Sequence, residues 1–290
     1  MPELPEVEGV VRDLKPLVEG KVIEHVLLSD VVHMSHADGK QTIVKGSDLD
    51  TFQLMVRYMK ITKVERRAKY IFIHLTKNDE PFVLVNHLGM TGAWFVVNDV
   101  TEIAEEKFRK HIHAIFKLTN GQLFVFSDIR RFGELRCIKS ISDHKPLTLM
   151  APEPFDDDAC DFFLAQCKKP KYEQKTIKEV IMDGQVISGC GNIYATESLF
   201  TTKIRPTKKV KSISKAKKIE LFNAIVAVLK ESIENGGSTI SDYRSVNGGA
   251  GSMQDRLKMY SRKVCPACLK ETTSVVIAGR TSTYCPSCQK

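Results

Sequence analysis

Residues 111–126 read HIHAIFKLTNGQLFVF, and this stretch decides the fold of the N-terminal half of the chain. Two runs of apolar, β-branched and aromatic residues, 111–118 and 122–126, flank the pair Asn120-Gly121. An Asn-Gly pair between two such runs favours a β-hairpin, because the tight turn needs residues that tolerate positive φ. Similar short runs occur earlier, at residues 70–75 and 82–85. The sequence therefore predicts an antiparallel β-sandwich or barrel over residues 20–140.

Helical patterns lie on both sides of this β-rich half. A helix is predicted over residues 5–18 by apolar residues at helical spacing, namely Val7, Val10, Val11, Leu14 and Leu17. Residues 140–158 are rich in Pro and Asp, which is typical of a linker. Further helices are predicted over residues 161–168, 176–183, 193–200 and 214–234, followed by a long mobile loop over the Gly-, Ser- and Asn-rich residues 235–252. This order indicates an α+β protein of two domains rather than an alternating α/β fold.

The charge balance bears on the partner. Lys and Arg number 43 against 35 Asp and Glu, which gives a net charge of +8 and a pI of about 9.0. Such a balance favours nucleic acid or an acidic membrane surface, although it also simply keeps a protein soluble. No run reaches the roughly 18 apolar residues of a membrane span, and residues 1–6 carry two acids and no basic region. We therefore expect a cytoplasmic, non-secreted protein in a reducing compartment.

The tail carries a candidate metal site. Two CxxC pairs, Cys265-Pro266-Ala267-Cys268 and Cys285-Pro286-Ser287-Cys288, are separated by 16 residues, and two such pairs complete a tetrahedral zinc site. Between them, residues 274–278 and 281–284 predict two strands joined at Gly279-Arg280. The alternative is a reduced tail without metal, but a segment so poor in apolar residues would not hold a hairpin unaided. Because cysteine fills all four positions, the one zinc ion would be structural. The other cysteines, Cys137, Cys160, Cys167 and Cys190, lack paired spacing and are predicted to be core or incidental thiols.

Six segments, in order, resemble the formamidopyrimidine-DNA glycosylase/endonuclease VIII family over essentially the whole chain. They are Pro2-Glu3-Leu4-Pro5-Glu6-Val7-Glu8, Arg66-Arg67-Ala68-Lys69-Tyr70, Asn86-His87-Leu88-Gly89-Met90-Thr91-Gly92, Asp128-Ile129-Arg130-Arg131-Phe132-Gly133, Gly191-Asn192-Ile193-Tyr194-Ala195, and Gly279-Arg280-Thr281 leading into the last CxxC pair. The resemblance implies an antiparallel β-sandwich with flanking helices over residues 1–145. It also implies a helical domain with a helix–two-turn–helix over 146–262 and a zinc-finger β-hairpin over 263–290.

The same resemblance implies a bifunctional DNA glycosylase and abasic-site lyase of base excision repair. After removal of Met1, Pro2 would be the nucleophile, because a secondary amine that adds to the sugar C1′ gives an iminium, an electron sink for β,δ-elimination. Glu3 resembles the family's general acid/base, and Glu6 an acidic residue that organises the same pocket. Taken alone, a proline at a helix start is ordinary.

The DNA contacts also follow from the resemblance. Lys69 and Arg280 match residues that bind phosphate at the lesion, and His87 and Lys178 match further phosphate contacts. Asn192 opens a helix after Gly189-Cys190-Gly191, where backbone N–H groups bind phosphate well. Met90, Arg130 and Phe132 match the side chains that fill the gap left by a base turned out of the duplex. The partner would be double-stranded DNA with oxidised bases or abasic sites, bound by a monomer, with a bacterial nucleoid location.

The lesion class rests on finer features. Leu4 and the three gap-filling residues favour the branch that removes 8-oxoguanine and formamidopyrimidines, since the endonuclease VIII branch usually has glycine at that fourth position. Residues 238–253 stand in the place of the family's flexible lesion-capping loop, but residues 245–254 depart from its usual lysine-proline-glycine-aromatic motif. No role follows for residues 97–110. The alternatives are an oxidised-pyrimidine glycosylase, a non-catalytic damaged-DNA-binding protein, or a zinc-ribbon accessory protein of transcription, which leaves the N-terminal half unexplained.

Overall fold

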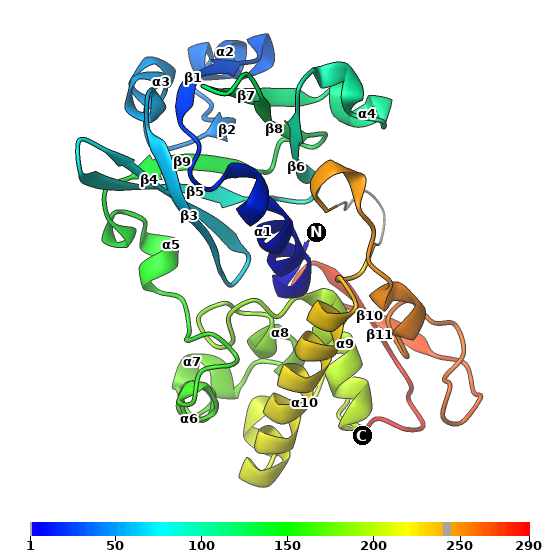
Figure 1. Cartoon of the computed structure of the whole chain (residues 1–290). Helices are drawn as coiled ribbons and strands as arrows, with labels where there is room; N and C mark the ends of the chain where they lie inside the picture. Colours follow the sequence, from blue (N-terminus) through cyan, green and yellow to red (C-terminus); the bar gives the residue numbers. More distant parts are fainter. Residues whose placement is uncertain (1, 240–244) are drawn as a thin grey trace. The chain divides into compact units, whose positions relative to one another are not determined.

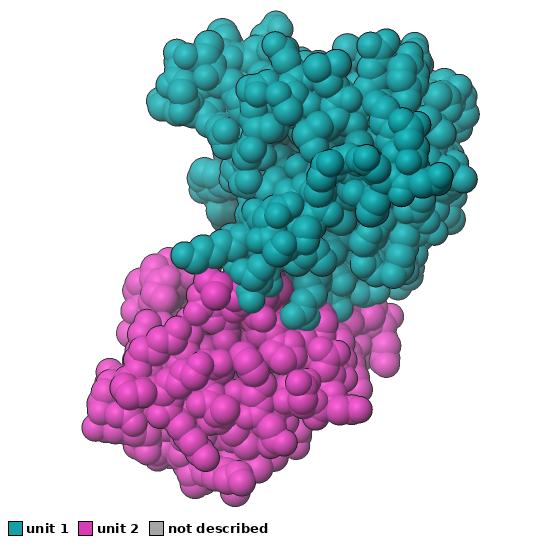
Figure 2. Space-filling model, turned by 90° about the vertical axis from the view of Figure 1, so that its left-hand side faces the viewer, with its two compact units in different colours: residues 1–148, 236–252 teal, residues 149–235, 253–290 magenta. Residues whose placement is uncertain are grey.

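The computed structural model describes residues 2–239 and 245–290, which belong to two compact units (Figures 1 and 2). Unit 1 comprises residues 1–148 and 236–252, and unit 2 comprises residues 149–235 and 253–290. The three-domain division at residues 145 and 262 stays a prediction. Of the described residues, 236–239 and 245–252 pack with the β-rich half. Within the described ranges, no helix is both long enough and apolar enough to cross a membrane.

Unit 1 is built on two β-sheets, as the sequence predicted (Figure 1). The first sheet is antiparallel, in the order β1 (Ile23–Leu28), β7 (Ile112–Leu118), β8 (Leu123–Asp128), β6 (Gly92–Val97). The second has the order β2 (Ile43–Val44), β9 (Glu134–Ile138), β5 (Glu80–His87), β4 (Tyr70–Lys77), β3 (Lys60–Arg67), and only the β2–β9 pair is parallel. The predicted hairpin is confirmed, because Ile115 of β7 lies opposite Val125 of β8.

The helices of unit 1 cover these sheets and begin with α1. Their bounds are α1 (Leu4–Val18), α2 (Asp30–Ala37), α3 (Leu49–Val56), α4 (Glu106–Arg109) and α5 (Lys145–Thr148), with short 3-10 turns η1 (Val100–Glu102), η2 (Ile141–Asp143) and η4 (Val246–Gly248). The apolar face of α1 is buried in the main core and packs against β3. In that core Trp94 of β6 stacks on Phe124 with ring centroids 4.1 Å apart, and its Nε1 donates to Asn86 Oδ1 of the other sheet at 2.9 Å. This joins the two sheets.

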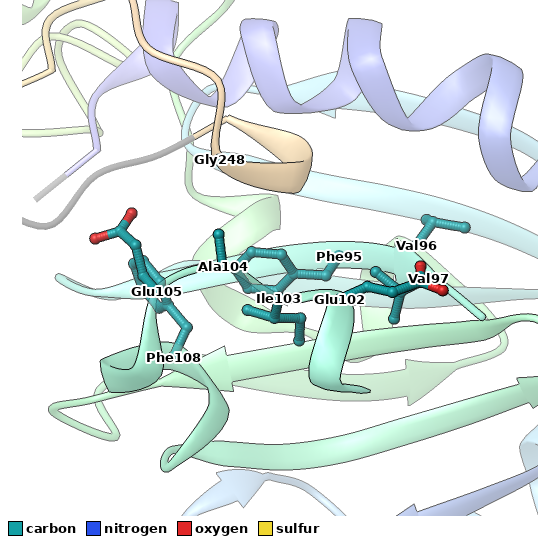
Figure 3. Close-up of a pocket in the computed structure, with 9 residues that line it drawn as sticks. All are labelled: Phe95, Val96, Val97, Glu102, Ile103, Ala104, Glu105, Phe108 and Gly248. Atoms are coloured by element: carbon teal, nitrogen blue, oxygen red, sulfur yellow. The ribbon is translucent and has the colours of Figure 1, made fainter. Parts of the chain in front are cut away.

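Residues 97–110, to which the sequence analysis assigned no role, form a second small core on the four-stranded sheet. Ile103 and Phe108 pack with Phe95 of β6 and Val125 of β8. The same segment lines a pocket that Gly248 completes from η4 (Figure 3). Its role is therefore structural at least in part: it covers apolar side chains that the sheet would otherwise present to water.

Unit 2 is helical and carries the tail hairpin. It contains α6 (Ala159–Cys167), α7 (Pro170–Glu173), α8 (Ile177–Ile181), α9 (Asn192–Thr201), α10 (Lys215–Glu234), η3 (Val210–Ser212), η5 (Met253–Arg256), β10 (Thr273–Ile277) and β11 (Arg280–Tyr284). The four helices predicted from the sequence are thus confirmed as α6, α8, α9 and α10. Residues 182–191, rich in turns, join α8 to α9, and α10 packs against α9.

Candidate functional site

The start of α1 holds the first three predicted site residues. Pro2 and Glu3 are buried, and Glu3 is the N-cap residue with extended backbone (φ −103°, ψ −172°). Glu6 lies one turn later, and its Oε2 accepts a hydrogen bond from the Glu3 N–H at 2.8 Å, as part of a capping box. The box fixes the direction in which the chain enters the helix. Pro2 therefore lies next to a firmly held residue.

Glu6 also binds the segment that returns to unit 1 from the distant part of the chain. Its Oε1 accepts from the backbone N–H of Ser238 at 2.7 Å, and Gly237, with φ +80°, lies close against its side chain. Further along, Ser245 donates to Asp13 of α1, and Val246 is buried in the main core. Residues 236–239 and 245–252 are thus attached to α1, although the sequence predicted a mobile loop. Residues 240–244 of that predicted loop lie outside the described residues.

Lys69 lies in the two-residue turn between β3 and β4. Ala68 before it has φ +52°, a conformation rare for a residue with a side chain, and its carbonyl accepts from Arg66 Nη1 at 3.1 Å. Arg66 in turn forms an ion pair with Glu8 of α1, with 2.6 Å between Nε and Oε2. These contacts fix the turn that carries Lys69 against the helix that carries Pro2.

His87 lies at the end of β5, where the charge of Lys69 affects its pKa. Burial, and next the positive charge of Lys69, lower the pKa of His87 to about 4. Its Nδ1 accepts from the Gly89 N–H at 3.0 Å, so the neutral ring carries its proton on Nε2. His87 can thus offer an N–H donor to a phosphate but no charge.

Met90, Arg130 and Phe132 come from two loops that the structure brings together. Phe132 is 55% exposed, and the Arg130 guanidinium lies 5.0 Å from the centroid of its ring. Met90 is half-buried on the neighbouring loop. An exposed large aromatic ring beside a cation is a feature suited to contact with bases.

Asp128 and Thr91 lie directly beneath these loops, and both are buried. The Asp128 carboxylate accepts from the backbone N–H groups of Arg130 and Gly133 at 3.2 and 2.7 Å. Thr91 Oγ1 donates to Asp128 Oδ1 at 2.5 Å and accepts from the Arg130 N–H at 2.8 Å. The sequence analysis quoted both residues within motifs without giving them a role. The sequence signal for Asp128 was its position two residues before Arg130. Only contacts between residues far apart in the chain show that Asp128 is buried.

In unit 2, the predicted phosphate contacts gather at the start of α9. Lys178 is 0% exposed, and its Nζ donates to the Asn192 carbonyl at 3.1 Å and to Thr196 Oγ1 at 2.5 Å. Asn192 Nδ2 donates to the Thr281 carbonyl at 3.0 Å. In this structure Lys178 therefore supports the helix start, and its contact with phosphate stays a prediction. Asn192 connects the helix start to the strand that begins with Arg280.

Arg280 is exposed at the tip of the β10–β11 hairpin. Ala278 and Gly279 form the turn with φ +48° and +71°. The segment before the hairpin is fixed to α9 by Glu197, whose buried carboxylate accepts from the backbone N–H groups of Lys258, Met259 and Tyr260 at 2.7–2.9 Å. The hairpin is therefore attached to the helix at both its base and its second strand. The sequence analysis missed Glu197, since a glutamate inside a helix carries no signal of such a role.

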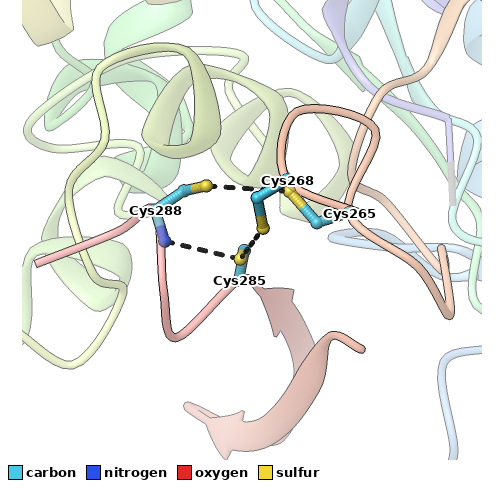
Figure 4. A group of neighbouring side chains, drawn as sticks. All are labelled: Cys265, Cys268, Cys285 and Cys288. Carbon is cyan, nitrogen blue, oxygen red and sulfur yellow. Dashed lines mark hydrogen bonds between the residues drawn. The ribbon is translucent and has the colours of Figure 1, made fainter. Parts of the chain in front are cut away.

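The four predicted metal ligands converge at the base of the hairpin (Figure 4). The Sγ atoms of Cys265, Cys268, Cys285 and Cys288 all lie within 4.8 Å of one another, with 3.9 Å between Cys265 and Cys288 and 3.5 Å between Cys268 and Cys285. Zinc–sulfur bonds of about 2.3 Å in a tetrahedron place sulfurs about 3.8 Å apart, so the donor set fits such an ion. Among the described residues this is the one cluster of candidate ligands. The four ligands would leave no open position for catalysis.

Comparisons with known proteins cover the whole chain. Residues 1–135 match the formamidopyrimidine-DNA glycosylase N-terminal domain, and residues 150–244 match the formamidopyrimidine-DNA glycosylase H2TH domain. A formamidopyrimidine-DNA glycosylase of Exiguobacterium sp. is 36% identical over 294 residues, with 100% of both chains covered. The MutM (Fpg) protein of Thermus thermophilus has a similar structure, with a TM-score of 0.81, 31% identity, and 99% and 98% of the two chains covered.

Structures of a similar protein from Lactococcus lactis, Fpg, contain DNA. One is a complex with DNA that contains N7-benzyl-Fapy-dG, with a TM-score of 0.83, 27% identity and full coverage of both chains. Another is a complex with DNA that contains an abasic site, with a TM-score of 0.82, 27% identity and 99% of each chain covered.

Proposed function

Because the chain belongs to the formamidopyrimidine-DNA glycosylase family, we propose that Pro2 is the nucleophile of its reaction on damaged DNA. The protein is a DNA glycosylase and abasic-site lyase of base excision repair. We propose formamidopyrimidine and 8-oxoguanine lesions as its substrates, on the basis of Leu4 and the three residues Met90, Arg130 and Phe132. The observation that carries the proposal is the buried start of α1, where Pro2 adjoins a capping box shared by Glu3 and Glu6.

The reaction follows from the chemistry of a terminal secondary amine. Once Met1 is removed, the Pro2 nitrogen adds to C1′ of the damaged nucleotide while the bond from C1′ to the base breaks and the base leaves with a proton. The bond from C1′ to the ring oxygen then breaks, the ring oxygen takes up the proton that the Pro2 nitrogen loses, and the product is an open-chain iminium between Pro2 and C1′. Its positive charge accepts electrons during β- and then δ-elimination of the two phosphates. We assign the movement of protons at the sugar to Glu3, because it directly follows Pro2 in the chain and is buried at the helix start.

Each unit contributes groups that suit phosphate binding. In unit 1, Lys69 is held on a fixed turn and offers a charge, whereas His87 offers a neutral N–H donor. In unit 2, the start of α9 offers backbone N–H groups, and Arg280 offers a guanidinium on the hairpin tip. Each of these groups suits contact with a phosphate of the DNA backbone, and we propose that the two loops of unit 1 enter the base stack.

The metal we propose is zinc. The support is the chemistry of four thiolates at tetrahedral spacing, which suits a soft-to-borderline ion with no open coordination site. When bound, the ion supplies rigidity to the β10–β11 hairpin rather than any step of the reaction. Cys265 and Cys268 would hold it from the turn before β10, and Cys285 and Cys288 would hold it from the turn after β11.

The experiment that tests this function uses duplexes that each carry one lesion: 8-oxoguanine, a formamidopyrimidine, an oxidised pyrimidine or an abasic site. Base release, strand cleavage and borohydride trapping of a protein–DNA adduct are measured for the native protein and for a form with one extra residue before Pro2. We expect purine-lesion release and trapping for the native protein and neither for the extended form. Normal trapping by the extended form would overturn the role of Pro2, and tight lesion binding without cleavage by the native protein would overturn the enzymatic function.

A further inference from the structure

We infer that Asp128 and Thr91 are positioning residues that hold Met90, Arg130 and Phe132 as one rigid unit able to enter the base stack. This inference rests on the proposed function of those three side chains. It assigns a role to two buried residues that make no contact with DNA themselves. They act from beneath, by joining the two loops on which the three side chains stand.

The Asp128 carboxylate closes the loop that carries Arg130 and Phe132. One oxygen accepts from the Gly133 N–H at 2.7 Å and the other from the Arg130 N–H at 3.2 Å, so the carboxylate spans the loop from its start to its end. Between these points Arg131 has φ +58°, in the left-handed region that a residue with a side chain seldom adopts. Such a conformation persists where the surroundings fix it, and the two hydrogen bonds do so here.

Thr91 joins this loop to the one that carries Met90. Its hydroxyl donates to Asp128 Oδ1 at 2.5 Å and accepts from the Arg130 N–H at 2.8 Å, so one oxygen bridges both loops. Met90 is the preceding residue in the chain. Any displacement of Arg130 therefore pulls on the backbone next to Met90. Thr91 is buried, which places both hydrogen bonds away from competing water.

The backbones of the two loops also lie in direct contact. A Cβ atom on Gly89 would lie 2.6 Å from the Phe132 carbonyl carbon and 2.6 Å from the Gly133 nitrogen, so no side chain fits there. Gly89 has φ +61°, which glycine adopts readily. The loops thus meet at two places, through the Thr91–Asp128 pair and through Gly89.

The two loops need a rigid backbone because of the side chains that they expose. Phe132 is 55% exposed with the Arg130 guanidinium over its ring, so the protein leaves a large apolar side chain in water. Separating stacked bases costs free energy. A flexible loop would bend away from the bases instead of separating them. The buried carboxylate and hydroxyl hold the backbone at the root of each inserted side chain, and we assign them that function.

The test compares Thr91→Val with the wild type and with Thr91→Ser, which keeps the hydroxyl. Ser127→Ala is the matched control, because Ser127 is the residue before Asp128 and its buried hydroxyl also lies within hydrogen-bond distance of two backbone carbonyls, those of Phe108 and His111. Thermal stability, single-turnover release of 8-oxoguanine and cleavage of a preformed abasic site are measured for each. A 2-aminopurine placed next to the lesion reports, by its fluorescence, whether the stack is opened.

We expect Thr91→Val to lower lesion release roughly tenfold to a hundredfold, because small displacements of positioned groups have effects of that size. Cleavage at the abasic site should change by less than about threefold, since there is no base to unstack. Thr91→Ser should restore lesion release and the 2-aminopurine signal, and Ser127→Ala should lose stability without a selective loss of lesion release. Asp128→Asn is a second variant that should follow Thr91→Val.

The outcomes distinguish a failure of the proposed function from a failure of the positioning role of Asp128 and Thr91. If the wild type neither releases base nor cleaves an abasic site, the proposed function fails. If the wild type is active and Thr91→Val keeps the wild-type ratio of lesion release to abasic-site cleavage, the inference is overturned. An equal loss of both activities in Thr91→Val and Ser127→Ala would also overturn it, because the hydroxyl would then serve only general stability.

Discussion

Replacing Glu6 with glutamine tests how the start of α1 is held. The Glu6 side chain is 2% exposed, and its two oxygens accept from the Glu3 N–H at 2.8 Å and the Ser238 N–H at 2.7 Å. Glutamine has the same shape but only one oxygen, so one backbone N–H would face an amide N–H₂ group. The side chain has little room to turn away, because a Cβ on Gly237 would lie 3.1 Å from it.

The magnitude follows from the bond that is lost. A hydrogen bond to a buried charged group contributes about 1.5–3 kcal/mol, so the free energy of unfolding of unit 1 should fall by that amount. For a domain of this size that corresponds to a decrease in Tm of roughly 3–12 °C. The rate of adduct formation at Pro2 should fall by roughly tenfold to a hundredfold, because Pro2 and Glu3 lose the contact that positions them.

The assay measures Tm by calorimetry and the rate of borohydride-trapped adduct at saturating DNA, below the Tm of the variant. Glu19→Gln serves as the control, since Glu19 caps the other end of α1 and the hydrogen bond that its side chain accepts from the Val64 N–H at 2.7 Å survives with the glutamine oxygen. Unchanged Tm and unchanged trapping in Glu6→Gln would refute the reasoning. A loss of Tm with a normal trapping rate would refute its catalytic part alone.

The cysteine cluster, His87 and the two cations Lys69 and Arg280 each allow a further prediction. Stripping the metal with a chelator should release one zinc ion per chain, measured by mass spectrometry, and abolish lesion-DNA binding; full binding by the metal-free protein would contradict this. The folded-state pKa of His87 lies at about 4, below 6.5 for the unfolded chain, so only the unfolded chain takes up this proton as pH falls from 6.5 to 4. Stability in urea should therefore decline over that window, and less steeply in His87→Gln; equal slopes would argue against a buried neutral ring. Lys69→Ala and Arg280→Ala should each weaken lesion-DNA binding and reduce the salt dependence by about one unit, unlike the surface control Lys139→Ala, and an unchanged slope would reassign them to structure.

The parts of the fold that the sequence predicted are those with local causes. The β7–β8 hairpin follows from its alternation and from Asn120-Gly121, and α10 from its apolar stripe. The cysteine cluster follows from spacing alone, because two residues between cysteines already point both thiols at one place.

The features that the sequence did not predict depend on contacts between residues far apart in the chain. Residues 236–252 look like a loop by composition, yet Glu6 and Asp13 of α1 bind Ser238 and Ser245 of the described parts of this segment. Residues 97–110 show no usable periodicity because they cover a few apolar side chains of one sheet face. Parallel pairing of β2 with β9 joins strands far apart in the chain, and a two-residue strand leaves no pattern to find.

The candidate site likewise contains residues that the sequence predicted and supporting residues that only the structure identifies. Pro2, Lys69 and Arg280 were named through motifs of a known family, and the structure adds contacts of the neighbouring segments: Glu6, the Arg66–Glu8 pair and the Glu197 carboxylate. Two of these supporting residues, Glu6 and Glu197, are buried acids that accept backbone N–H groups. Sequence patterns do not reveal them, because a surface carboxylate at a helix start or in a turn looks identical.

The central claim is that the bond to DNA forms at the Pro2 nitrogen, and mapping the trapped adduct tests it most directly. The native protein is incubated with an 8-oxoguanine duplex and borohydride, digested, and the cross-linked peptide is sequenced by tandem mass spectrometry. We expect a sugar remnant on the N-terminal nitrogen of Pro2, in a peptide that lacks Met1. A remnant on a lysine such as Lys69, or on a chain that still begins with Met1, would contradict it.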